Sequence, residues 1–222
     1  MTDPSPRHTS LDFEVEMRSV RERFASMARC CGDQLQLALE AFWTGSKDLS
    51  ARVEASDNEV DAYEKSMDEM AFHVLALRQP VASDLRTLTA VLKLVTDLER
   101  IGDEAVDIAR GTAPASGDAQ VMRDRLRRMA ETSEKMFHSA VSSFLDEDVA
   151  AAQEVRRING AVDVAYEEVL ADSIALTSRH PTEAASAMAG LNAAKCLRRM
   201  ADHAKNIAEG TLFVARGEEM PR

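Results

Sequence analysis

The chain has 222 residues, of which 45 % are hydrophobic and only 5 % are aromatic, and its formal net charge is −11. A chain of this length can bury one large core or two small ones, and few aromatic residues beside many Ala, Leu, Val and Met residues favour packed helices over a β-sandwich. The acidic balance argues against nucleic acid as a partner, because such binding usually requires a dense Lys/Arg surface.

Helical periodicity dominates the first half of the chain. Apolar residues recur at helical spacing in three segments, at about 11–43, 48–78 and 81–110. Thr44-Gly45-Ser46 separates the first two segments and Gln79-Pro80 separates the next two, since a proline moves the residue before it out of the helical region. We therefore predict a first three-helix bundle over residues 11–110, after a polar, disordered N-terminus at 1–10.

The second half repeats this organisation after a Gly/Pro/Ser-rich linker at 111–118. Three further helical segments are predicted at about 119–145, 148–178 and 182–215, which form a bundle over 119–216 with a short tail at 217–222. Short breaks between helices make consecutive helices antiparallel neighbours. The fold expected is all-α, with two tandem antiparallel three-helix bundles.

An internal duplication relates these two bundles. A shift of about 102 positions places Asp61 on Asp163, and in the last helix of each half a shift of about 99 places Asp103 on Asp202. Matched charged residues in a shared order and at a nearly constant shift indicate a true repeat of three helices.

Carboxylates on two helices of the first half form the candidate metal site. Glu99, Asp103 and Asp107 follow one another at i, i+4 and i+8, on the side of the helix away from its apolar stripe, and Asp57 and Asp61 form a similar pair on the preceding helix. Like charges at i, i+4 oppose each other by about 0.2–0.5 kcal/mol per pair, and a hard cation reverses that sign. A row of acids is also typical of plain solvated surface, so spacing alone leaves both interpretations open.

Three segments resemble motifs of the PhoU family. Residues 97–109, DLERIGDEAVDIA, resemble the acidic motif of that family, residues 79–86, QPVASDLR, resemble the segment before it, and residues 197–209, LRRMADHAKNIAE, resemble a second copy of the motif. The likeness extends over about residues 11–215. It identifies the chain as a member of a family of regulators of phosphate uptake and phosphate signalling.

The resemblance implies a cytoplasmic, homodimeric protein that restrains the phosphate-starvation response. It implies two partners, namely the ATP-binding subunit of the phosphate ABC transporter and the phosphate-sensing histidine kinase. It also implies divalent or iron-type metal ions at the acidic motifs. No signal peptide and no apolar run of transmembrane length are visible, so direct membrane insertion is not expected.

The second half departs from the family pattern. Arg198 stands opposite Glu99 and Asn159 stands opposite Asp57, so two carboxylates are missing from the equivalent site. A weaker second metal site is therefore predicted, from Asp163, Asp202 and Asn206. His203 is either an extra ligand there or an exposed structural histidine.

No enzymatic activity is expected from the remaining motifs. A ferritin-like carboxylate enzyme requires Glu-x-x-His pairs, and no Glu lies three residues before any His. No phosphate-binding Gly-rich loop and no nucleophile motif are present either, so no catalytic residue and no organic cofactor are predicted. The alternative to a phosphate regulator is a metal-binding helical scaffold or a carboxylate-metal enzyme. The cysteines Cys30, Cys31 and Cys196 form no CxxC pair and are expected to be small residues in or near the core.

Overall fold

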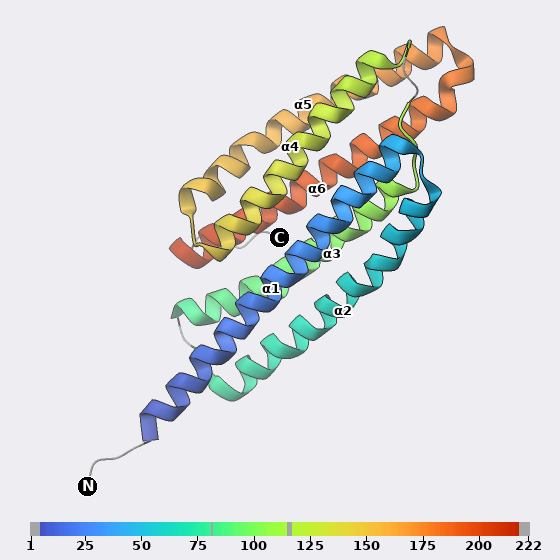
Figure 1. The fold of residues 1–222 in the computed structure, drawn as a ribbon. Helices are drawn as coiled ribbons and strands as arrows, with labels where there is room; N and C mark the ends of the chain where they lie inside the picture. Colours follow the sequence, from blue (N-terminus) through green and yellow to red (C-terminus); the bar gives the residue numbers. More distant parts are fainter. Residues whose placement is uncertain (1–4, 81, 115–116, 218–222) are drawn as a thin grey trace.

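The computed structural model describes residues 5–80, 82–114 and 117–217, and this part of the chain is helical without a strand. The first bundle contains α1 (Ser5–Thr44), α2 (Lys47–Arg78) and α3 (Ala82–Ala109). The second contains α4 (Gln120–Leu145), α5 (Val149–Arg179), the short 3₁₀ helix η1 (Pro181–Glu183) and α6 (Ala184–Arg216). Figure 1 shows the two bundles side by side, which confirms the predicted all-α fold with two repeats.

The first helix begins earlier than expected. Helix α1 starts at Ser5, within the segment 1–10 that was predicted to be disordered, and residues 1–4 lie outside the described part of the chain. In the predicted tail, Gly217 is described and residues 218–222 are not.

Local sequence signals explain where the helices begin and end. The side chains of Ser46 and Asp148 accept hydrogen bonds from backbone N–H groups in the first turns of α2 and α5, which satisfies donors that have no partner inside the helix. At the other end of α2, Gln79 adopts a left-handed conformation (φ 47°) immediately before Pro80. Gly217 ends α6 with φ 68°, a conformation that glycine adopts without steric cost.

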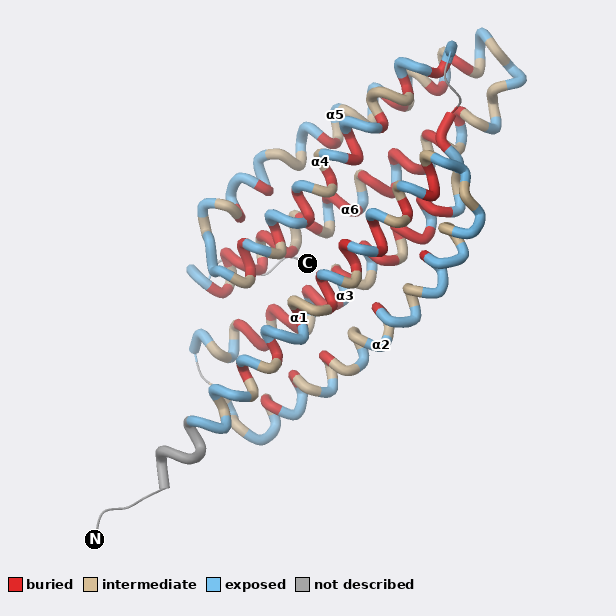
Figure 2. Tube along the Cα trace, in the orientation of Figure 1, coloured by how far each residue is buried: buried red, intermediate tan, exposed pale blue. Residues whose placement is uncertain are grey.

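Helices α3 and α6 form the centre of the molecule, and α2 and α5 lie on its outside (Figure 1). Figure 2 shows that the outer helix α2 is buried only along one narrow stripe, and fewer of its residues are buried than in the central helix α3. The two central helices approach closely at Gly210, where an added Cβ would lie 2.7 Å from Cδ1 of Leu94. The two repeats are therefore packed against each other through α3 and α6, and the contact depends on a glycine.

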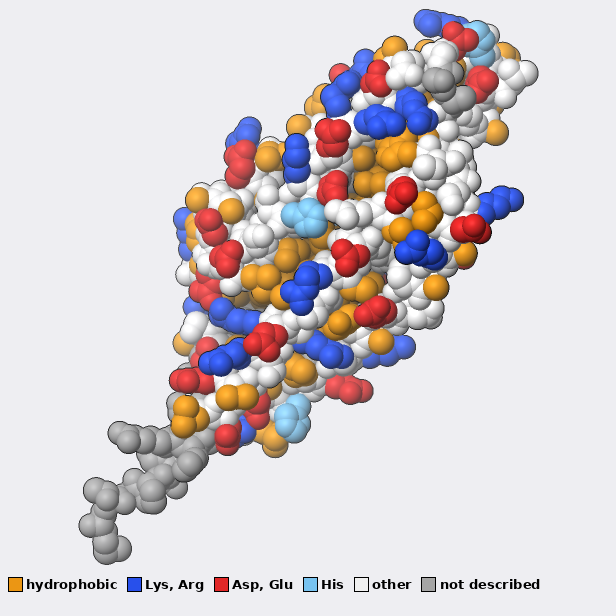
Figure 3. All heavy atoms as spheres, viewed as in Figure 1, with side chains coloured by type: hydrophobic (Ala, Val, Ile, Leu, Met, Phe, Trp, Pro, Cys, Tyr) orange, Lys and Arg blue, Asp and Glu red, His pale blue; other side chains and the backbone are white. Residues whose placement is uncertain are grey.

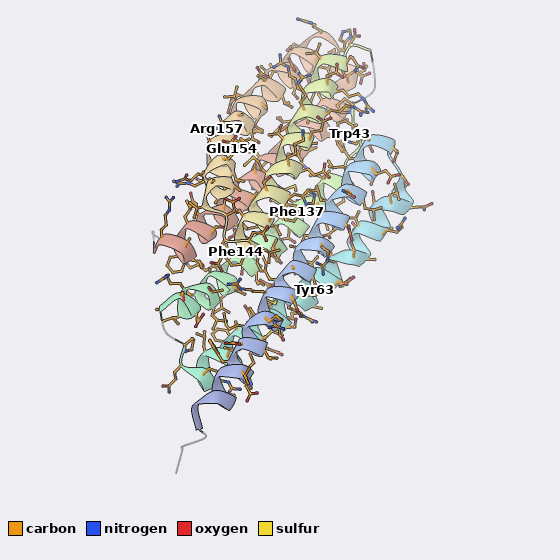
Figure 4. The ribbon with its side chains drawn as sticks, turned by 60° about the vertical axis from the view of Figure 1, so that its left-hand side comes forward. Trp43, Tyr63, Phe137, Phe144, Glu154 and Arg157 are labelled. Atoms are coloured by element: carbon orange, nitrogen blue, oxygen red, sulfur yellow. The ribbon has the colours of Figure 1, made fainter. Side chains whose placement is uncertain are left out.

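Aromatic side chains make a second contact between the repeats, where α1 meets α4. The ring of Phe24 on α1 lies against the ring of Phe144 on α4, with centroids 4.9 Å apart. Figure 4 shows Phe137 and Phe144 along the same helix, and Phe137 also lies next to Gly32 of α1. Both bundles consequently contribute large buried side chains to a shared core.

The surface carries intermingled charges. Figure 3 shows Lys/Arg and Asp/Glu side chains scattered over the visible face, with hydrophobic side chains between them. In the described ranges, no helix combines the length and the apolar character that crossing a bilayer requires.

Candidate metal centre

Helices α2 and α3 bring together the acidic residues of the first half. Gly102 lies on α3 between Glu99 and Asp103, and a Cβ added there would lie 3.0 Å from Oε1 of Gln34 and 3.5 Å from Oδ1 of Asp57. The missing side chain leaves room for the amide of Gln34, which in turn donates a hydrogen bond to Asp57. The predicted acidic rows of α2 and α3 therefore face one another.

The carboxyl group of Asp57 is half-buried among other acids. Its Oδ1 accepts a hydrogen bond from Nε2 of Gln34 at 3.0 Å. Burial is the main cause that raises the pKa of Asp57, and the carboxylates of Asp61 and Asp103 raise it further, against the opposing effect of the Gln34 hydrogen bond. The ionised form of Asp57 is thus stabilised less than it would be in water.

Glu99 has a buried oxygen atom that lies near Arg100 but accepts no hydrogen bond. Its side chain is only 18 % exposed, and its Oε2 is buried without a hydrogen bond from any described residue. The nearest cation is Arg100, whose Nε lies 3.4 Å away. Burial raises the pKa of Glu99, and the carboxylates of Asp103, Glu64 and Asp61 add to the rise.

The residues at this position are of the type that a hard cation prefers, but in the described ranges no three of their carboxylate groups have oxygen atoms within 4.8 Å of one another. Asp61 and Asp103 each interact electrostatically with both Asp57 and Glu99, and a buried carboxylate oxygen without a hydrogen bond is the kind of ligand that a cation satisfies. Asp107, the last residue of the predicted row, lines the same pocket as Asp57 and Asp103. Its side chain is exposed, and its Oδ1 accepts a hydrogen bond from Nη1 of Arg110 at 3.2 Å.

The carboxylates of the second half already have donors. Nε of Arg198 lies 2.7 Å from Oδ1 of Asp163, and the guanidinium stacks over the Tyr166 ring at 5.2 Å from its centroid. Nδ2 of Asn159 donates to Oδ1 of Asp202 at 3.1 Å. An arginine and an amide therefore already pair with these two carboxylates.

Asn206, which was predicted to join Asp163 and Asp202, donates its hydrogen bond to a residue of the first repeat. Its Nδ2 donates to Oδ1 of Asp97 on α3 at 2.9 Å. Nδ1 of His203 lies 2.8 Å from the same oxygen atom. Both of these α6 side chains thus contact the first repeat, and the half-buried His203 is a structural partner of Asp97.

A polar pocket of about 690 Å³ lies over the contact of α3 and α6. Both acidic and basic side chains line it, and some of them form ion pairs, such as Arg199 with Glu104, whose Nη1 and Oε1 atoms are 3.1 Å apart. The lining residues are Asp57, Arg100, Asp103, Glu104, Val106, Asp107, Arg110, Arg199, Asp202 and His203. The sequence analysis did not find this pocket, because no motif within one helix indicates which residues of α3 meet α6.

Asp57→Asn is expected to stabilise the metal-free protein at neutral pH by a few tenths of a kcal/mol, the size of one relieved like-charge pair. A carboxyl whose pKa is raised by folding favours the folded state when protonated, and this contribution is lost as the pH rises through the folded pKa. The advantage of the variant should therefore shrink as the pH falls into the range of carboxyl titration. Urea unfolding at several pH values, in the presence of chelator, measures it.

The exposed Glu69 on the same helix offers a matched control, Glu69→Gln. This control variant should unfold like the parent protein at each pH. An Asp57→Asn variant that is less stable than the parent at neutral pH would contradict the crowding of carboxylates described above.

The family model described as "PhoU domain" matches the chain twice, over residues 24–112 and 126–211. A Pseudomonas aeruginosa protein named "Phosphate-specific transport system accessory protein PhoU homolog" is 30 % identical over 220 residues, which cover 98 % of this chain and 91 % of that protein. The "Phosphate-specific transport system accessory protein PhoU" of Escherichia coli is 28 % identical over 214 residues, which cover 96 % and 89 % of the two chains.

Solved structures agree with this likeness. The crystal structure of PhoU from Pseudomonas aeruginosa matches with a TM-score of 0.86 and 30 % identity, over 92 % of this chain and 99 % of that one. The phosphate transport system regulatory protein PhoU from Streptococcus pneumoniae matches with a TM-score of 0.84 over 95 % and 99 % of the two chains. The second match is 22 % identical and supports the fold alone.

Proposed function

The chain belongs to the PhoU family, and from this premise we propose that it is an accessory protein of phosphate-specific transport that restrains the phosphate-starvation response. The proposal rests on likeness along nearly the whole chain to proteins named as accessory proteins of that transport system. The acidic cluster of the first half, in which a buried oxygen of Glu99 accepts no hydrogen bond, supplies the chemical feature by which such a regulator would act.

The acidic cluster would hold the metal through Asp57, Asp61, Glu99 and Asp103. A bound divalent or iron-type cation supplies positive charge that attracts phosphate or an acidic patch of a partner protein. Without the cation, the clustered carboxylates of the same face repel both. Loading of the site would thereby switch the charge that α2 and α3 present to a partner.

The residues of the second half would bind metal weakly or not at all. Arg198 neutralises Asp163, and the amide of Asn159 occupies one oxygen of Asp202. The two repeats would thus have different tasks, with metal-dependent binding in the first and fixed charge pairing in the second.

The chain would act as an adaptor without catalysis of its own. Its partners would be the ATP-binding subunit of the phosphate transporter and the sensor histidine kinase, which it would meet in the cytoplasm as a homodimer. Long helices with mixed surface charge offer faces for such contacts (Figure 3).

Deletion of the gene should raise the activity of a phosphate-starvation reporter in phosphate-rich medium, because a negative regulator would be missing. The measurement compares the deletion strain with the parent and with a strain that carries the gene on a plasmid. Reporter activity that stays low in the deletion strain, in a genome without a second copy of the family, would refute the proposed restraint.

A further inference from the structure

The contact of α3 with α6 creates two equivalent clusters of three side chains. A shift of 99 positions relates their members pairwise, as it relates the last helices of the two repeats. One cluster contains Asp97, His203 and Asn206, and the other contains Cys196, Glu104 and Asp107. In the first cluster, Oδ1 of Asp97 lies 2.8 Å from Nδ1 of His203 and accepts a hydrogen bond from Nδ2 of Asn206 at 2.9 Å. The three side chains of this cluster are therefore joined by hydrogen bonds through Asp97.

The second cluster contains three metal-binding side chains, and the donors to its carboxylates, Arg199 and Arg110, come from outside the cluster. The thiol of Cys196 and the carboxylates of Glu104 and Asp107 place one ligand atom each within 4.8 Å of the others. Within the described ranges, this is the one group of at least three His, Cys, Asp or Glu side chains that lies so close together. Cys196 is buried, as the sequence analysis expected of a small core residue, and it also meets Glu104 and Asp107 across two helices.

Glu104 has one buried carboxylate oxygen atom that accepts no hydrogen bond. The residue is only 8 % exposed, and its Oε2 is buried without a hydrogen-bond partner in the described structure. Its other oxygen, Oε1, lies 3.1 Å from Nη1 of Arg199. A buried carboxylate oxygen without a partner is costly, and a cation bound at that atom removes the cost.

We propose that Cys196, Glu104 and Asp107 form a binding site for a zinc-type divalent cation between the two repeats. Zinc accepts thiolate sulfur together with carboxylate oxygen, and three protein ligands leave a fourth position open. The thiolate distinguishes this site from the all-carboxylate cluster of α2 and α3, because hard cations prefer oxygen ligands alone.

The surroundings allow such a cation to enter. Glu104 and Asp107 line the 690 Å³ pocket, whereas Cys196 lies beneath them at 2 % exposure. The arginines that pair with the two carboxylates, Arg199 and Arg110, have side chains 52 % and 59 % exposed. The pair of Arg110 with Asp107 is exposed on both sides and contributes little to stability. Glu104 is buried in its pair with Arg199, but only its Oε1 is engaged there, so Oε2 remains available to a metal.

Binding changes the protonation of the cysteine. Burial is the main cause that raises the pKa of the Cys196 thiol, its interaction as a hydrogen-bond donor with Glu104 is the next, and the charges of Glu104 and Asp107 add to the rise. The metal-free residue is therefore a neutral thiol. On coordination a metal–sulfur bond forms and the thiol proton is released to solvent, without a change of oxidation state.

Cobalt titration tests the proposal, since Co²⁺ replaces zinc and its bond to a thiolate gives an intense near-ultraviolet absorption band. The full chain, freed of metal by a chelator, should develop this band up to one equivalent of Co²⁺, and Zn²⁺ should abolish it. Cys196→Ser should eliminate the band, and Glu104→Gln should weaken the Co²⁺ affinity about tenfold or more. Circular dichroism shows whether each variant is folded.

Two control variants show which cysteine and which acidic cluster bind the Co²⁺ ion that gives the band. Cys30→Ser removes the half-buried cysteine, whose charged neighbours include Asp33 and Glu59, and should leave the band intact. Glu99→Gln removes a residue of the all-carboxylate cluster and should also leave it intact. A parent protein without the band, a band that survives in Cys196→Ser, or one that disappears in Cys30→Ser would overturn the proposed site. None of these outcomes depends on the role of the chain in phosphate signalling.

Discussion

Phe24→Ala is expected to lower the free energy of unfolding by about 3–5 kcal/mol, the cost of truncating a fully buried aromatic side chain. Phe24 is 0 % exposed, and its ring lies against Phe144 of the other repeat at a centroid distance of 4.9 Å. The substitution leaves a cavity where α1 meets α4, so it removes packing from both bundles at once. Denaturant unfolding followed by circular dichroism measures the loss.

The same substitution at an exposed position provides the control. Phe72 on α2 is 61 % exposed, and Phe72→Ala should change the free energy of unfolding by no more than about 0.5 kcal/mol. Equal losses in the two variants would show that the contact of α1 with α4 does not contribute to stability as the ring geometry indicates.

The double substitution Glu99→Gln with Asp103→Asn is expected to remove metal from the first repeat and to leave the phosphate-starvation reporter active in rich medium. Both side chains keep their size but lose the charge that would hold the cation. The reporter should reach the level of the deletion strain, because the metal-free face no longer attracts its partner. Elemental analysis of the purified protein and the reporter assay measure the two effects separately.

The second repeat supplies a matched control for this variant. Asp163→Asn with Asp202→Asn removes two carboxylates that already have donors, so metal content and reporter activity should stay at the parent level. Retained metal and normal regulation in the first-repeat variant would contradict the proposed role of Glu99 and Asp103. Equal metal occupancy in both repeats would contradict the proposed difference between them.

The sequence alone was sufficient for the fold and for the acidic rows. Apolar residues at helical spacing, helix-ending signals such as Gln79-Pro80 and the repeated motif predicted two bundles of three helices, because these signals act within a few residues of one another. Residues four positions apart lie on one helix face, so the row of Glu99 and Asp103 was visible without a structure. The facing pair on α2 required only that neighbouring helices be antiparallel.

Contacts between the repeats needed the tertiary structure. Asn206 and His203 are bound to Asp97, Glu104 has a buried oxygen without a partner, and Cys196 lies beside that glutamate. The sequence analysis assigned Asn206 to the second-half site and Cys196 to the core, since both were judged by their neighbours along the chain. Which side chains meet across α3 and α6 is decided by the relative position of two packed helices, and the close approach at Gly210 sets that position.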